Sequence, residues 1–159
     1  MELSNLQDEV IIIKNFIPQS ECIKFLQRVP APYKMDSSEL PWEHRLVDII
    51  KHPVTKYVEN YWNKYFKTNK LKIYESLIQL WPIQSKSDSH IHTEPDRAQG
   101  TYNSILYLND NFFGGEFFTN KITIKPKPGM LTFFNGKTTN HGLHPVHWNN
   151  RYAITFWFN

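Results

Sequence analysis

The chain has 159 residues, of which 40% are apolar and 15% aromatic, and a formal net charge of +3 at pH 7. This length suits one ordinary domain, and the supply of apolar side chains excludes an intrinsically disordered chain. The small charge excess is spread evenly, so nothing in it calls for nucleic acid or an anionic membrane as a partner. A single cysteine, Cys22, excludes a disulfide framework and a multi-cysteine zinc module. No apolar run is long enough to span a bilayer, so we expect one soluble, cytoplasmic domain covering residues 1–159.

The first 69 residues are expected to supply supporting elements. Val10–Ile13 is a short β-branched run that is typical of a strand. Gln19–Val29 places its apolar side chains mostly on one helical face, which predicts a helix. A second helix is predicted over His52–Phe66, where apolar and aromatic residues recur at three- and four-residue spacing. Prolines and small polar residues in the segment 30–44 predict a loop, and this loop is a candidate lid over a site.

From residue 70 onward the sequence changes to short runs rich in β-branched and aromatic residues. Turn-forming pairs such as Gly114-Gly115 and Asn135-Gly136 separate these runs. Many short strands at close spacing predict a sandwich or jelly roll, with the two helices packed outside one sheet. We therefore expect a mainly β fold with flanking helices, whose jelly-roll core is residues 70–159. The predicted strands are Leu71–Trp81, Tyr102–Leu108, Glu116–Thr119, Lys121–Lys125, Met130–Phe134 and Tyr152–Phe158.

Candidate metal ligands gather in this second half. Alternate side chains of an extended strand point to the same face, so His92 and Glu94 can converge on one ion. His141, further along the chain, is the best candidate for a third ligand. Two imidazoles and one carboxylate with open positions opposite them suit non-haem Fe(II), which must still bind a cosubstrate and oxygen. His90 shares a face with His92, so its part in metal binding stays open, and polar strand residues without a metal remain the alternative.

Arg151 begins the nearly all-apolar final strand. Counted by two, it shares a face with Ala153, Thr155 and Trp157. A guanidinium at the mouth of a barrel can hold a carboxylate through two parallel hydrogen bonds. Beside a metal triad, such an arginine predicts a metal-chelating dicarboxylate that is anchored at its far end. The alternative is an arginine exposed at the rim of the sheet.

Seven short motifs, taken in order, make residues 92–158 resemble the Fe(II)/2-oxoglutarate-dependent dioxygenases, and most of all the branch related to prolyl 4-hydroxylase. Weaker agreement extends back to Ile13–Ile17, which is similar to how those catalytic domains begin. The motifs are His92-Thr-Glu94, Ser104-Ile-Leu-Tyr-Leu-Asn-Asp110, Gly114-Gly-Glu-Phe117, Lys125-Pro-Lys-Pro-Gly129, Leu131-Thr-Phe-Phe134, His141-Gly-Leu-His-Pro-Val146 and Arg151-Tyr152.

The resemblance implies a double-stranded β-helix, a cupin-like barrel, in which His92, Glu94 and His141 bind Fe(II). Arg151 is then expected to pair with the C5 carboxylate of 2-oxoglutarate, and Tyr107 matches a tyrosine whose hydroxyl also touches that carboxylate. The implied activity is hydroxylation of a substrate C–H bond, coupled to the use of O2 and the conversion of 2-oxoglutarate to succinate and CO2. Ascorbate is a candidate accessory reductant.

The chain departs from the family pattern at two positions. Glu94 stands where aspartate is usual, and its additional methylene changes how the carboxylate reaches the ion. Trp81 stands where many relatives carry a tyrosine of the cosubstrate pocket, so a hydroxyl contact available to them is expected to be missing here.

Three alternatives and the substrate stay open. His90, His92 and His141 could form a three-histidine cupin-type centre with Asp96 as an extra ligand, although Met130–Phe134 lacks the histidine expected there. A nucleic-acid demethylase of the same superfamily is disfavoured, because the final strand lacks the Asn and the second Arg of its pattern. A non-catalytic binding module could retain the fold. The partner is expected to be a prolyl peptide or a small amino-acid-like molecule, and the oligomeric state is left open.

Overall fold

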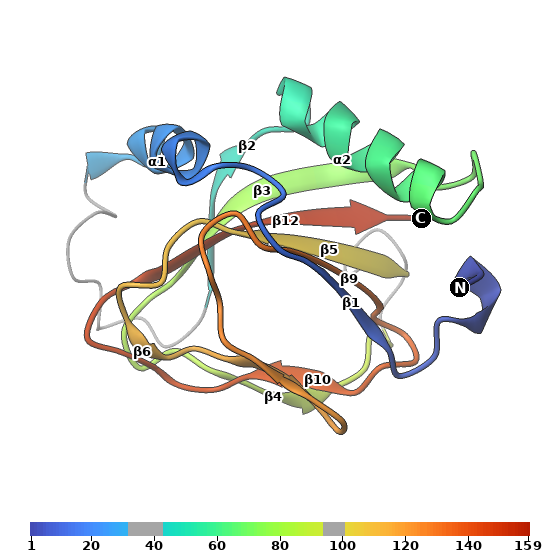
Figure 1. Ribbon diagram of the computed structural model, residues 1–159. Coiled ribbons are helices and arrows are strands. Elements are labelled where there is room, and N and C mark those ends of the chain that lie inside the picture. The colour runs from blue at the N-terminus through green and yellow to red at the C-terminus, as the bar shows by residue number, and fades with distance from the viewer. Residues whose placement is uncertain (32–42, 94–100) are drawn as a thin grey trace.

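The computed structural model describes residues 1–31, 43–93 and 101–159, and most of their regular structure is β-strand (Figure 1). Its elements, in chain order, are η1 (Leu3–Asn5), β1 (Val10–Ile13), α1 (Gln19–Gln27), β2 (His44–Asp48), α2 (Pro53–Tyr65), β3 (Ile73–Trp81), β4 (Ser87–His90), β5 (Tyr102–Tyr107), β6 (Phe113–Gly114), β7 (Phe117–Thr119), β8 (Thr123–Ile124), β9 (Leu131–Asn135), β10 (His141–Leu143), β11 (Val146–His147) and β12 (Arg151–Phe158).

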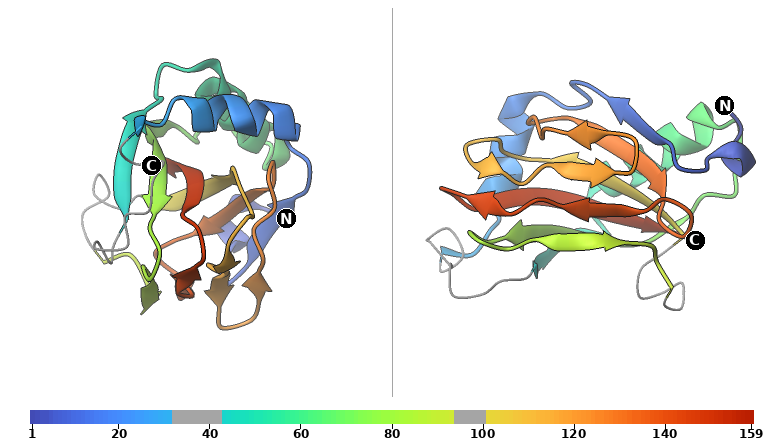
Figure 2. Two further views of the ribbon diagram at one scale, coloured as in Figure 1. Left: turned by 90° about the vertical axis from the view of Figure 1, so that its left-hand side faces the viewer. Right: turned by 90° about the horizontal axis from the view of Figure 1, so that it is seen from below.

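Two sheets face one another across the interior (Figures 1 and 2). The larger sheet has six strands in the order β1-β9-β5-β12-β3-β2, and the smaller has four in the order β4-β10-β7-β8. A two-stranded ribbon, β11-β6, completes the described strands. Every described pairing is antiparallel. This arrangement confirms the predicted mainly β jelly roll with flanking helices.

Both helices cover the outer face of the larger sheet (Figure 1). Helix α2 begins after His52, whose side chain accepts a hydrogen bond from the Val54 amide and caps the first turn. Trp62 of α2 is fully buried, and its indole Nε1 donates to Ser104 Oγ at 2.9 Å. Ser104 in turn donates to the carbonyl of Thr132 at 2.7 Å. The chain of hydrogen bonds therefore fixes the position of α2 over β5 and β9, and the apolar contacts around it supply the stabilisation.

Strand β12 divides its side chains between two environments. Tyr152, Ile154, Phe156 and Phe158 belong to the core beneath the helices. Ala153 belongs to a second core between the sheets. The remaining odd-numbered residues of β12 turn toward a cavity between the sheets, as the alternation of a strand requires. These residues are Arg151, Thr155 and Trp157.

The predicted elements agree with the structure in the long segments and differ in the short ones. Both predicted helices are present within two residues of their expected ends. Strand β2 was missed: it begins at His44, the last residue of the expected loop, and no element was predicted for its other four residues. The rest of that loop, residues 32–42, lies outside the described residues, as does the proposal that it forms a lid. The first 69 residues do more than support the core, because β1 and β2 pair within the larger sheet.

Strands β4, β6, β10 and β11 were also missed, since each has four residues or fewer and little apolar character. Among the helices of the described residues, none combines the length and the apolar character needed to cross a membrane.

Candidate active site

A cavity of about 340 Å³ opens between the two sheets. Three histidines, His90, His92 and His141, lie on one side of it, on or beside the smaller sheet. Arg151 enters the same cavity from β12 of the larger sheet. A histidine cluster that could hold a metal ion and a buried cation therefore face the same cavity, which is the arrangement expected of a ligand site with few, well-placed polar groups.

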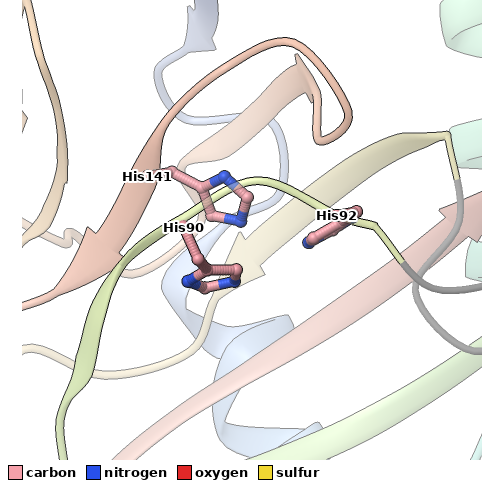
Figure 3. A group of neighbouring side chains, drawn as sticks. All are labelled: His90, His92 and His141. Atoms are coloured by element: carbon pink, nitrogen blue, oxygen red, sulfur yellow. The ribbon is translucent and has the colours of Figure 1, made fainter.

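The three imidazoles form one cluster (Figure 3). His90 and His141 are direct partners across the β4–β10 pairing, and their ring centroids lie 4.5 Å apart. The ring of His92 lies 4.8 Å from that of His141 and 5.7 Å from that of His90. One ring nitrogen from each residue lies within 4.8 Å of the other two. The cluster can thus offer three nitrogen ligands to one ion.

His141 is held in a state that suits a metal ligand. Its Nδ1 lies 2.7 Å from the Thr139 carbonyl, to which it can only donate, so the lone pair is left on Nε2. Burial lowers the pKa of His141 to about 3, and the charges of His90 and His92 act in the same direction, while the hydrogen bond to Thr139 opposes them. The ring is therefore neutral at physiological pH, which a metal ligand requires.

His92 reaches the cluster because Gly136 leaves room for it. The His92 amide donates to the Gly136 carbonyl at 2.8 Å, which holds this segment against the turn after β9. A Cβ on residue 136 would lie 2.3 Å from Nδ1 of His92. The Asn103 amide lies 3.4 Å from the same Nδ1. Glycine at 136 is therefore required by close approach of an imidazole, and its backbone is not in the left-handed region.

Arg151 is a buried cation without a carboxylate beside it among the described residues. Its side chain is 2% exposed, and its Nε donates to the Gly115 carbonyl at 3.0 Å. Gly115 has φ +66°, and a Cβ there would lie 3.1 Å from Cδ of Arg151 and 2.8 Å from the Phe112 ring. Burial lowers the pKa of Arg151, yet a guanidinium stays protonated in proteins. A buried charge is costly when it is not paired, so this site is suited to an anion.

Tyr107 lies behind Arg151 in the core between the sheets. The Arg151 guanidinium carbon is 5.1 Å from the Tyr107 ring centroid. The Tyr107 hydroxyl is buried, and the polar side chains beside it, Thr132 and Arg151, approach without a hydrogen bond of normal geometry. Burial raises the pKa of this hydroxyl, and the neighbouring cation acts in the opposite direction. Tyr107 thus holds a neutral hydroxyl next to the buried guanidinium.

The structure brings together some of the predicted site residues, and two others lie outside the described residues. His92, His141 and Arg151 line the same cavity. Tyr107 lies next to Arg151 and does not itself line the cavity. Glu94, the predicted carboxylate ligand, lies outside the described residues, as does Asp96.

Several polar residues of the cavity were not identified from the sequence. The Gln79 side chain donates to the Glu43 carboxylate, and Thr155 Oγ1 donates to Gln79 Oε1 at 2.5 Å. Arg45 lies over the Trp157 ring, with its guanidinium carbon 4.9 Å from the centroid. Thr155 had been grouped with Arg151 by the alternation of the final strand, but no polar contact had been predicted for it.

Comparison of the chain with known proteins identifies its family. The family model of the 2OG-Fe(II) oxygenase superfamily matches residues 79–159, about half of the chain. The human 2-oxoglutarate and iron-dependent oxygenase domain-containing protein 3 is 36% identical over an alignment of 95 residues that covers 52% of this chain and 30% of that protein. The rat prolyl 3-hydroxylase 2 is 38% identical over an alignment of 65 residues that covers 36% of this chain and 9% of that protein. The chain thus spans less than a third of either relative.

Solved structures share the fold at low sequence identity. A viral collagen prolyl hydroxylase from Paramecium Bursaria Chlorella virus-1, in complex with 2OG, superposes with a TM-score of 0.70 at 17% identity and 94% coverage of both chains. A Pseudomonas putida prolyl-4-hydroxylase gives a TM-score of 0.68 at 15% identity, covering 99% of this chain and 94% of that one. The family model and the similar sequences confirm the resemblance inferred from the seven motifs, and the chain belongs to the 2OG-Fe(II) oxygenase superfamily.

Proposed function

We propose that the chain is the catalytic domain of an Fe(II)- and 2-oxoglutarate-dependent dioxygenase that hydroxylates a C–H bond of its substrate. The observation that carries this proposal is the buried Arg151 guanidinium, which faces the same cavity as the histidine cluster and has no carboxylate partner among the described residues. A cosubstrate that chelates a metal at one end and ends in a carboxylate at the other matches both features.

The residues present fit Fe(II). Neutral imidazoles are good ligands for this ion, and His141 already donates its Nδ1 proton to a carbonyl, which leaves Nε2 for the metal. His92 and His141 are the imidazole ligands of the proposal. The third ligand is Glu94 according to the sequence, and it lies outside the described residues.

The residues also fit 2-oxoglutarate. Arg151 would bind the C5 carboxylate, and the Tyr107 hydroxyl beside it would donate to the same group. With Fe(II) bound, the site would supply oxidative chemistry in which O2 converts 2-oxoglutarate to succinate and CO2 while a substrate C–H bond is hydroxylated. Ascorbate belongs to this proposal as an accessory reductant.

Other residues of the cavity hold the Arg151 and His141 side chains in position. The Gly115 carbonyl fixes the Arg151 side chain through Nε, which leaves its two terminal nitrogens available to bind a carboxylate beside the Tyr107 hydroxyl. Phe117 and Phe134 line the cavity and pack against the ring of His141, with centroids 5.8 and 4.7 Å away. These aromatic walls keep bulk water from the imidazole and orient it toward the cavity.

The substrate class is proposed from the relatives. Prolyl hydroxylases occur among both the similar sequences and the similar structures, and one of the latter is a Trichoplax adhaerens prolyl hydroxylase in complex with a hypoxia inducible factor peptide fragment. The proposed substrate is therefore a prolyl residue of a peptide or a small amino-acid-like molecule. The cavity is also lined by charged side chains of both signs that could contact such a substrate, namely Glu43, Arg45 and Lys86.

The test is an anaerobic titration of the full chain with Fe(II) and 2-oxoglutarate, followed by the visible charge-transfer absorption of the chelate. We expect a band in the wild type and, for Arg151→Gln, an apparent Kd for 2-oxoglutarate that is about 100-fold higher, because the variant loses a buried charge pair worth about 3 kcal/mol. Arg28→Gln, at an exposed arginine, is the matched control and should behave as the wild type. A band of unchanged affinity in Arg151→Gln would reject the proposal.

A further inference from the structure

The cavity is longer than the proposed cosubstrate. Arg151, Thr155 and Trp157 line it from the single strand β12, and the first and last of them are about 20 Å apart at about 3.3 Å per residue. Fully extended 2-oxoglutarate is shorter than about 9 Å, since its carbon chain and terminal oxygens span six bonds of about 1.5 Å or less. A cosubstrate anchored at Arg151 therefore leaves the end of the cavity beside Trp157 for the substrate.

A carboxylate lies at this end of the cavity, and hydrogen bonds fix its orientation. The side-chain amide of Gln79 donates to one oxygen of Glu43, and the buried Thr155 hydroxyl donates to Gln79 Oε1 at 2.5 Å. Arg45 Nε donates to the other oxygen of Glu43 at 3.3 Å. Each carboxylate oxygen has two lone pairs, so Glu43 can still accept hydrogen bonds from a ligand in the cavity.

The charges around Glu43 leave an excess of negative charge. Arg45 forms ion pairs with Glu43 at 3.3 Å and with Glu75 at 4.0 Å, so one guanidinium serves two carboxylates. Lys86, which also lines the cavity, is paired with Asp88 at 3.1 Å. Within the described parts of the chain, these ion pairs hold one more negative than positive charge. A cation is therefore favoured at this end of the cavity and an anion is disfavoured.

We infer that the substrate carries a protonated amine and that Glu43 is the residue that selects it. A carboxylate already oriented by Gln79 and Arg45 binds an ammonium group without first being ordered. A prolyl residue inside a peptide has neither an ammonium group nor an N–H, so the inference favours an amine-bearing molecule over it. The inference rests on the proposed function, because the amine belongs to the molecule that the oxygenase would hydroxylate.

Two sources of the amine are distinguished by two pairs of probes. L-Proline and N-acetyl-L-proline differ in a free α-amine, while acetyl-Gly-Lys-Gly-amide and its norleucine analogue differ in a side-chain amine. Each probe is titrated anaerobically by calorimetry into the full chain with Fe(II) and 2-oxoglutarate, so binding is measured without turnover. We expect the amine-bearing member of one pair to bind about 10- to 100-fold more tightly than its partner, the usual worth of a hydrogen bond to a charged group.

Glu43→Gln tests the assignment to this residue. The variant keeps the size of the side chain and an oxygen for the Gln79 amide, and it removes the charge, so the preference for the amine should fall below about threefold. Glu9→Gln, in an exposed ion pair with Lys121 outside the cavity, is the matched control and should keep the preference of the wild type. Circular dichroism and thermal unfolding check the folding of both variants.

The outcomes separate this inference from the proposed function. Absence of a preference in both probe pairs would overturn the inference, as would a preference that persists in Glu43→Gln. Either result would leave the proposed function intact, provided that the charge-transfer band of the Fe(II) chelate forms in the same wild-type sample. Absence of that band would reject the proposed function and the inference together.

Discussion

At the scale of single residues, Gly136 is the position whose replacement should affect the site most selectively. A Cβ there would lie 2.3 Å from Nδ1 and 2.5 Å from Cε1 of His92, so Gly136→Ala must push this ring away. We expect the variant to fold and to bind Co(II) or Fe(II) about 10- to 100-fold more weakly, the usual cost of disturbing the support of a metal ligand. Calorimetric titration measures this. Thr138→Ala, at an exposed position of the same turn, is the control, and equal affinity in both variants would contradict the prediction.

The buried hydroxyl of Tyr107 gives a second prediction at this scale. Since the hydroxyl makes no hydrogen bond of normal geometry, Tyr107→Phe should not lower the free energy of unfolding and can raise it by about 1 kcal/mol. If the hydroxyl donates to the cosubstrate, the same variant should bind 2-oxoglutarate about five- to tenfold more weakly, the worth of about one hydrogen bond.

Denaturant unfolding and 2-oxoglutarate titration of Tyr107→Phe separate these two effects. Tyr102→Phe is the matched control on the same strand, because Tyr102 packs against the core beneath the helices. Unchanged 2-oxoglutarate affinity in Tyr107→Phe would remove Tyr107 from the binding site while leaving Arg151 in it.

At the scale of elements, Glu59 connects α2 to the start of β3. Its carboxylate accepts from the Ile73 amide at 2.9 Å and forms ion pairs with Lys56 at 2.6 Å and Lys72 at 3.7 Å. Burial alone would raise the pKa of Glu59, but the hydrogen bonds from Lys56 and Ile73 and the two lysine charges outweigh it and hold the pKa below its ordinary value of 4.5. The folded state therefore binds the proton less tightly than the unfolded state.

A depressed pKa in the folded state means that this stabilisation is present above about pH 4.5 and is lost as the pH falls through the lower, folded-state pKa. We expect Glu59→Gln to lower the free energy of unfolding by about 1 to 2 kcal/mol at pH 7, with the difference from wild type shrinking between pH 5 and pH 3. Denaturant titrations across that pH range measure it. Glu21→Gln, in an exposed pair with Lys24, should show almost no effect, and a pH-independent difference for Glu59→Gln would refute the argument.

The long helices and strands could be predicted from the sequence, whereas some of the short strands could not. The helices were predicted because an apolar face repeats over two to three turns, and β12 because the predicted strand Tyr152–Phe158 is almost all apolar. Alternation along β12 correctly grouped Arg151 with Thr155 and Trp157, which line the cavity. Strands β4 and β10, which carry His90 and His141, could not be predicted, because short polar strands are defined by the partner they pair with and not by their own pattern.

The pairing of β4 with β10 is also the part of the site that could not be predicted from the sequence. Alternation predicted that His90 and His92 share a face, but the register that places His90 opposite His141 is a long-range property. The contact between the cavity-facing Gln79 and Glu43 is also long-range, because Gln79 lies on β3 and Glu43 lies just before β2, in a segment that was expected to be a loop. Local sequence therefore identified the candidate ligands and not their distances.

At the scale of the whole molecule, the two halves of the sequence are not separable. The core beneath the helices combines residues of α1 and α2 with residues of β3, β5, β9 and β12. Its central contact is Trp62 of α2 with Phe133 of β9, whose ring centroids lie 4.7 Å apart. A fragment without the helices would expose one entire face of the larger sheet, a large apolar surface that soluble monomers avoid.

We therefore expect residues 70–159 alone not to fold, although they contain every described residue of the histidine cluster and Arg151. The fragment should lack near-ultraviolet circular dichroism and bind a hydrophobic dye, and an added 1–69 fragment should restore part of the signal. The full chain under the same conditions is the control. A 70–159 fragment that unfolds cooperatively would show that the helices are dispensable.

The buried guanidinium of Arg151, which has no carboxylate partner in the described part of the chain, would couple the stability of the protein to the concentration of its cosubstrate. A folded chain that encloses a positive charge carries an electrostatic penalty, and a bound dicarboxylate removes it only from the folded state. Such selective binding adds about 2.7 kcal/mol of stability when the free ligand is at a hundred times its Kd. In a cell, the steady-state amount of this protein would then follow the concentration of that dicarboxylate, because protein molecules without the bound ligand unfold more often and are degraded sooner. The amount of the protein and its catalytic activity would therefore both increase with the dicarboxylate concentration, and no separate regulatory protein would be needed to detect it.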